Sequence, residues 1–213
     1  MRNNELNLPK EALVDKFIAK SKFYEKSTIN TKLQKEFVNS IKKITWKYKL
    51  AESTIGLATT DTVTEIQVFE VELKKMVLPL KVLKIIDKSI PYQILYRFLY
   101  NGNVSWGITL KDKTTVENYY FSQWNEDITF DFTGINLEKV YQKIVKSFID
   151  HKTSDESTFK NIVETDKKIK ALENEILLLE SKIKKEKHLN RKVEINKVLL
   201  EKKDQLKEIK CQR

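Results

Sequence analysis

The last third of the chain, residues 159–213, constrains the fold most, because it contains neither glycine nor proline and begins with a heptad pattern. Apolar side chains recur there at intervals of three, four or seven residues, and charged or amide side chains fill most positions between them. The predicted coiled-coil seam consists of Ile162, Ile169, Leu172, Ile176, Leu179 and Ile183. A single helix cannot bury so narrow a stripe, so the pattern predicts a long helix packed against a partner helix.

The heptad phase changes after Ile183. The apolar stripe that fits better there runs through Leu189, Val193, Asn196 and Leu200, with Leu199, Leu206 and Ile209 alongside. Either the chain reverses between Lys184 and Asn190 into an antiparallel hairpin, with Asn190 as the N-cap of the second helix, or one helix continues through a stutter. The absence of glycine and proline favours a continuous helix, whereas the similar lengths of the two arms favour the hairpin, which we expect.

The net charge of +10 is distributed unevenly along the 213 residues. Residues 10–49 hold eleven lysines against four acidic residues, and residues 155–213 hold sixteen basic against twelve acidic residues. The intervening stretch is nearly balanced. Basic ends of this kind allow binding to a polyanion, although a lysine-rich surface also arises without any nucleic acid partner.

Cysteine and histidine are too rare to build a familiar metal site. Cys211 is the single cysteine, and His151 and His188 are the only histidines. We therefore expect no intramolecular disulfide, no zinc site and no cofactor. The sequence has neither a signal-peptide pattern nor an apolar run of membrane-spanning length, which predicts a soluble cytoplasmic protein without membrane attachment.

Residues 1–150 are predicted to form an α+β body, followed by a polar linker at 151–158 and the long-helix arm at 159–213. Helical spacing predicts helices at 9–18, 31–44, 80–90 and 136–149. Alternation of apolar and polar residues predicts strands at 63–74, 92–100, 104–110, 116–124 and 128–132. Asn101-Gly102 marks a tight hairpin turn. The predicted fold is an antiparallel meander sheet flanked by helices, followed by a C-terminal antiparallel helical hairpin or coiled coil.

One motif is compatible with catalysis. Glu72 and Lys74 form an E-x-K pair at the end of a predicted strand, with Asp61 upstream. In metal-dependent nucleases two carboxylates bind a hard cation and a lysine polarises the phosphate. The same alternation also describes the solvated face of a half-buried strand.

Two clusters of basic residues are candidate contacts for nucleic acid or for an acidic partner. The first lies at the phase change and is opposed only by Glu186; its members are Lys182, Lys184, Lys185, Lys187, Arg191 and Lys192. The second lies near Trp46 and Tyr48 and comprises Lys42, Lys43, Lys47 and Lys49. Lysine and arginine at such positions can follow a phosphate backbone. The alternative for the first cluster is a solvated turn.

Five stretches together resemble a bacterial family of unknown function, DUF4391. They are LPKEALVDKFIAKSKFYEK, KKITWKYKLAESTIGL, IQVFEVELKK, IDKSIPYQILYRFLYNG and KIKKEKHLNRKVEINKVL. The resemblance extends over nearly the whole chain. It implies an association with DNA methyltransferases, restriction-type nucleases and helicases in defence against foreign DNA, and it supplies no catalytic residues.

The leading hypothesis is a non-catalytic binding and assembly module, an accessory subunit of a DNA-processing or anti-phage defence system. Its partner would be a larger helicase, methyltransferase or nuclease, with DNA as a further contact through the basic arm. One alternative is a small metal-dependent nuclease-like subunit that uses the E-x-K motif. The other is a coiled-coil homodimer scaffold joined through the C-terminal helices.

Overall fold

The computed structural model describes residues 6–26, 29–112, 115–149 and 158–211. The chain divides into two compact units, Met1–Phe148, here called the body, and Ile149–Arg213, here called the arm. The predicted polar linker at 151–158 lies outside the described residues except for Thr158, which is the N-cap of the first arm helix.

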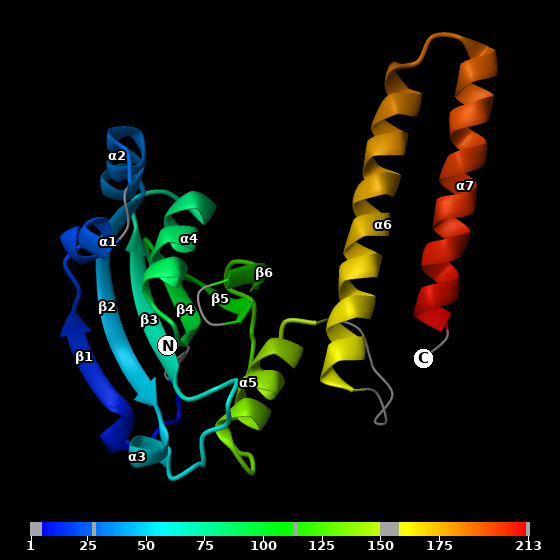
Figure 1. Ribbon diagram of the computed structural model, residues 1–213. Helices are drawn as coiled ribbons and strands as arrows, with labels where there is room; N and C mark the ends of the chain where they lie inside the picture. The colour runs from blue at the N-terminus through cyan, green and yellow to red at the C-terminus, as the bar shows by residue number, and fades with distance from the viewer. Residues whose placement is uncertain (1–5, 27–28, 113–114, 150–157, 212–213) are drawn as a thin grey trace. The chain divides into compact units, whose positions relative to one another are not determined.

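The described part of the body contains a six-stranded sheet whose strands lie in chain order (Figure 1). The strands are β1 (Leu13–Phe17), β2 (Ile41–Leu50), β3 (Ile66–Leu73), β4 (Gln93–Tyr100), β5 (Asn103–Asp112) and β6 (Thr115–Phe121). Neighbouring strands pair antiparallel, except that β3 and β4 are parallel. The prediction of a meander was therefore wrong at this pair. Helix α4 (Leu80–Ser89) provides the crossover that a parallel pair requires.

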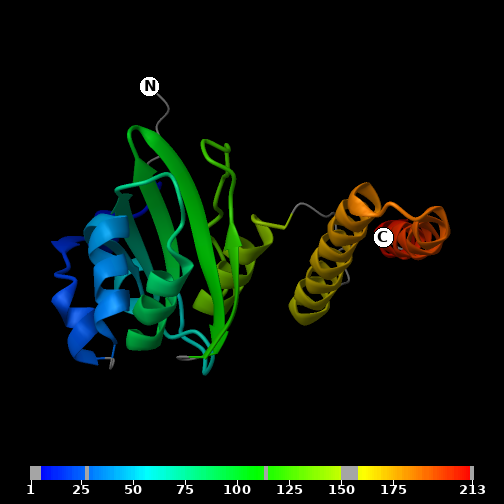
Figure 2. The same cartoon turned by 90° about the horizontal axis from the view of Figure 1, so that it is seen from above.

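Helices cover both faces of the sheet (Figure 2). One face packs against α4 together with α1 (Ser21–Lys26) and α2 (Thr31–Ser40), around buried Phe69, Tyr96 and Phe98. The other face carries α5 (Leu137–Lys146), whose Tyr141 hydroxyl donates to the Thr109 carbonyl at 2.8 Å. The remaining short helices are η1 (Lys10–Ala12) and α3 (Glu52–Ile55).

The predicted helices at 80–90 and 136–149, the four predicted strands between 63 and 124, and the Asn101-Gly102 turn are confirmed in type. Asn101 and Gly102 both have positive φ, 45° and 80°, as a tight hairpin turn of this type requires. The predicted strand at 128–132 is wrong. Its alternating pattern arises from ring packing, because Phe130 lies edge-on to Trp106 at 5.0 Å without a strand ladder.

Two N-terminal predictions were also wrong. Residues 13–17 form β1 rather than a helix, and the helix that begins at Thr31 ends at Ser40, so Ile41 and Ile44 belong to β2. A bulge between Ile41 and Lys43 shifts the phase of the strand. Both isoleucines consequently face the core at a spacing of three, which imitates a helical pattern.

The arm is an antiparallel hairpin of α6 (Phe159–Lys185) and α7 (Leu189–Cys211), which confirms the preferred prediction for residues 159–213. Two ion pairs show that the helices run antiparallel. Glu173 pairs with Lys210, and Glu180, farther along α6, pairs with Lys203, which comes earlier on α7, each at 2.8 Å. Of the predicted seam on α6, Ile162, Ile169, Leu172 and Ile176 are buried, and Leu179 and Ile183 are half-buried. This seam packs within one chain, because α7 lies beside α6.

The predicted stripe on α7 does not face α6. Leu189, Val193 and Leu200 are 74%, 63% and 55% exposed, whereas Leu199 is 6% exposed. The less exposed heptad positions on α7 are Ile195, Leu199, Lys202, Leu206 and Ile209. Asn190 lies inside the first turn of α7, so it is not the residue that precedes the helix.

Candidate functional site

Glu186 makes the reversal between α6 and α7 and replaces the glycine or proline that the turn lacks. Its extended backbone, with φ −73° and ψ 132°, ends α6. One oxygen of its carboxylate, Oε1, accepts hydrogen bonds from the backbone N–H groups of Lys187 and His188, both at 2.8 Å. These bonds, that from His188 first, hold the pKa of Glu186 below its usual range. Attraction to Arg191 and Lys192 lowers the pKa of Glu186 further, so this carboxylate binds the backbone of the turn and faces two cations as well.

The first predicted basic cluster is brought together at this reversal and is here called the tip cluster. Lys182, Lys184 and Lys185 lie in the last turn of α6, Lys187 lies in the turn, and Arg191 and Lys192 begin α7. All six side chains are exposed. No ion pair or hydrogen bond joins any of these six side chains to another residue within the described part of the chain.

Lysines farther down the arm behave differently. Lys202, Lys203 and Lys210 each form an ion pair with a glutamate of α6, at 2.8 Å in every case. These pairs link the two helices. Ion pairs therefore neutralise these three lysines of α7, whereas the six basic side chains of the tip cluster have no ion pair among the described residues and face mainly the single carboxylate of Glu186.

Helix stability accounts for only half of the tip cluster. Cations in the last turn of α6 interact favourably with the negative end of the helix dipole. Arg191 and Lys192 occupy the opposite end of a helix, the N-terminus of α7, where cations cost about 0.3–1 kcal/mol each at exposed positions. The Glu186 carboxylate attracts both cations and offsets part of this cost, but helix stability alone does not favour their positions.

The second predicted basic cluster is mostly neutralised. Lys42 pairs with Glu72 at 3.1 Å, Lys47 with Asp15 at 2.7 Å, and Lys49 with Glu65 at 3.1 Å. Lys43 is exposed on the same strand. Trp46 is half-buried against the core, and its indole N–H donates to the Tyr48 carbonyl at 2.9 Å. Three of the four lysines in this cluster thus have an ion-pair partner in the body, which leaves little free positive charge to bind a polyanion.

Asp61 does not lie close to the Glu72 and Lys74 of the E-x-K motif. Asp61 precedes β3, whereas Glu72 lies at the far end of that strand. Six residues from Ile66 to Glu72 extend about 20 Å at roughly 3.3 Å per residue. Glu72 is paired with Lys42, and Lys74 follows the strand. No group of three His, Cys, Asp or Glu side chains suited to a metal occurs among the described residues.

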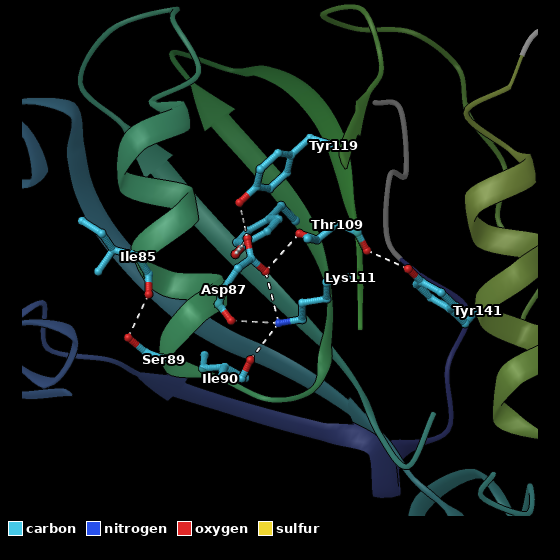
Figure 3. A network of polar contacts seen from close by, with 9 residues as sticks. Ile85, Asp87, Ser89, Ile90, Thr109, Lys111, Tyr119 and Tyr141 are labelled. Atoms are coloured by element: carbon cyan, nitrogen blue, oxygen red, sulfur yellow. Dashed lines mark hydrogen bonds and ion pairs between the residues drawn. The ribbon is translucent and has the colours of Figure 1, made fainter. Parts of the chain in front are cut away.

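A buried polar network, absent from the residues predicted above as functional, lies between α4 and the sheet (Figure 3). Asp87 is fully buried, and its carboxylate accepts hydrogen bonds from the hydroxyls of Tyr119 at 2.7 Å, Thr109 at 3.0 Å and Tyr96 at 3.1 Å. The ammonium of Lys111 lies 3.3 Å from the same carboxylate. The network joins α4 to β4, β5 and β6.

Lys111 is held by backbone as well as by charge. Its Nζ donates to the carbonyls of Ile90 at 2.8 Å and Asp87 at 3.2 Å. Burial raises the pKa of Asp87 and lowers the pKa of Lys111. The attraction within the pair acts against both shifts, and the three hydroxyl donors act against the shift of Asp87. Asp87 and Lys111 are 0% and 5% exposed, so the pair is enclosed and its role is structural.

Two features of the sequence indicate this network. Asp87 lies four residues after buried Leu83, on the apolar face of its helix, where an unpaired acid would be costly. Thr109 and Lys111 lie on one side of β5 at a spacing of two. A buried acid on a helix and an inward-facing lysine on a strand each need an opposite charge, so the presence of one predicts the other.

A family model described as a domain of unknown function (DUF4391) matches residues 6–206. The chain belongs to this family. The match to DUF4391 includes the body, all of α6 and most of α7, so the tip cluster is part of the family domain. Searches of curated proteins and of solved structures found no match. Among the described helices, none has the length and apolar character needed to cross a membrane.

Proposed function

We propose that this protein is a non-catalytic binding and assembly module, an accessory subunit of a bacterial DNA-processing or defence system. The body is the scaffold, and the helical arm docks a larger protein of that system through the tip cluster. The observation that carries this proposal is the set of six exposed basic side chains at one reversal, all without ion-pair partners in the described chain.

The length of the arm suits it to reach a partner. At about 1.5 Å per residue, the 27 residues of α6 extend roughly 40 Å. Interhelical ion pairs and the buried seam stiffen that length, so the cluster is presented on a defined element. Uncompensated charge on such an element promotes fast, oriented association with an acidic surface.

Affinity purification from the native host tests this function. Three baits are compared: the wild-type chain, a tip variant Lys187→Glu/Arg191→Glu/Lys192→Glu, and a control variant Lys81→Glu/Lys84→Glu/Lys88→Glu. The control makes the same charge change at exposed lysines of α4. Mass spectrometry identifies the proteins retained, before and after nuclease treatment of the lysate.

The wild-type and control baits are expected to retain the same DNA-processing enzyme, and the tip variant is expected to lose it. Retention after nuclease treatment indicates direct protein contact, whereas loss after the treatment assigns the contact to nucleic acid. Equal retention by the tip variant would overturn the assignment of the tip as the docking element.

A further inference from the structure

An exposed apolar stripe runs along α7 beside the tip cluster. It consists of Leu189, Val193 and Leu200, which are 74%, 63% and 55% exposed. At 3.6 residues per turn these three side chains fall within a sector of about 40°. Buried Leu199 lies about 80° to 120° from each of them around the helix. The stripe therefore points away from α6 and has no cover within the described part of the arm.

Lysines border this stripe on both sides. On the same helical projection, Lys192 lies about 60° to one side of Leu189 and Lys197 about 80° to the other. Both lysines are exposed and, like Arg191, have no ion-pair partner among the residues described. The three aliphatic side chains, with Asn196 between Val193 and Leu200 along the helix and one lysine on each side, form the surface here called the outer face of α7.

We propose that the outer face of α7 docks an acidic amphipathic helix of the partner protein. This inference rests on the proposed function and names the chemistry of the partner at the same arm. The aliphatic side chains require apolar cover, and the flanking lysines require carboxylates. From Leu189 to Leu200 the stripe extends eleven residues, or about 17 Å, which matches three turns of a docked helix.

Two other occupants fit the outer face less well. Duplex DNA supplies phosphates for the lysines, but its apolar contacts are limited largely to thymine methyl groups inside the major groove. A second copy of α7 would cover the leucines with leucines, but it would supply lysines together with Glu194 and Glu201 at the flanks, not carboxylates alone. An acidic helix satisfies both the apolar and the charged part of the surface.

Fluorescence anisotropy with the full-length protein tests this inference. The probe is a labelled helix-forming peptide of about 20 residues, long enough to form a helix, with a leucine stripe and glutamate flanks. A second peptide has the same leucines with lysine flanks, a third has the acidic composition with the leucines scrambled, and a duplex DNA is the fourth probe.

The test variant is Leu189→Ser/Val193→Ser. The matched control is Leu177→Ser/Leu178→Ser on α6, which removes two leucines that are 62% and 63% exposed. We expect the wild-type protein to bind the acidic amphipathic peptide about tenfold or more tightly than the other peptides. The stripe variant should weaken that binding about tenfold, and the control should leave it unchanged. Circular dichroism verifies that both variants keep their helices.

Equal binding of the acidic and lysine-flanked peptides would overturn the inference, as would unchanged affinity in the stripe variant. A third outcome separates it from the proposed function. If DNA binds, the stripe variant binds DNA normally and only the tip variant fails, then the helix partner is wrong while a role for the tip cluster survives. Retention of the host partner by the tip variant would refute docking through the tip cluster, on which this inference rests.

Discussion

Replacing Asp87 with asparagine tests the buried network most sharply, because the substitution keeps the size of the side chain and removes its charge. Three hydroxyls and one ammonium converge on this carboxylate, from Tyr96, Thr109, Tyr119 and Lys111. An amide has one oxygen with which to accept, and its NH₂ group faces donors. Lys111, which is 5% exposed, loses its counter-charge.

The expected loss of stability for Asp87→Asn is about 3–5 kcal/mol, the range for breaking one side of a buried ion pair. For a unit the size of the body this lowers the melting temperature by roughly 10–20 °C. Urea unfolding followed by tryptophan fluorescence measures the loss. All three tryptophans, Trp46, Trp106 and Trp124, belong to the body, so the signal reports that unit alone.

A double variant, Asp87→Leu/Lys111→Met, provides the control. Because it removes both charges, it should be more stable than Asp87→Asn, as is often found when a buried pair is replaced by apolar groups. If Asp87→Asn lies within about 1 kcal/mol of the wild type, the typical net contribution of one ordinary hydrogen bond, the importance of the network is refuted.

Three further predictions concern the arm and the sheet. Because the pKa of Glu186 is lowered in the folded chain, its carboxylate stabilises the turn above its usual pKa of about 4.3 and loses this effect as the pH falls through the folded value. The amide NMR shifts of Lys187 and His188 should therefore titrate below about pH 4.3, and Glu186→Gln should abolish that titration. Ile176→Ala should cost about 2–4 kcal/mol in the arm and reduce far-UV helicity, with the tryptophan transition unchanged. Gly107→Ala should destabilise the body by about 1–3 kcal/mol in urea unfolding, because a Cβ there would lie 2.6 Å from the Phe121 ring; a neutral result would show that the ring moves freely.

Local patterns predicted most elements of the body but failed where two patterns coincide. The bulge in β2 places Ile41 and Ile44 on one face at helical spacing, so periodicity alone extended α2 too far. The strands and the helix between them at residues 63–100 were predicted, but their parallel pairing depends on the crossover connection. Strand alternation alone favours antiparallel order, whereas the helix between these two strands allows them to pair in parallel.

In the arm, the hairpin was predictable and its inward face was not. The sequence of α7 offers two apolar stripes, one through Leu189 and Val193 and one through Leu199 and Leu206. Only contact with α6 decides between them, and it buries the second. No turn motif in the sequence marks the reversal, because its stabilising group, the Glu186 carboxylate, accepts hydrogen bonds from backbone N–H groups. The charge pattern of the sequence indicates the tip cluster, but only the structure shows that its side chains form no ion pair within the described residues.

Site-specific photo-crosslinking in the native host tests most directly whether the tip meets a partner. Lys187 is replaced by a photo-reactive amino acid in one chain, and exposed Lys84 on α4 is replaced in another. We predict a discrete protein adduct from position 187 and none from position 84, with the adduct lost when Arg191→Glu and Lys192→Glu are added. Irradiation that yields no adduct at position 187, or equal adducts at both positions, would contradict docking through the tip.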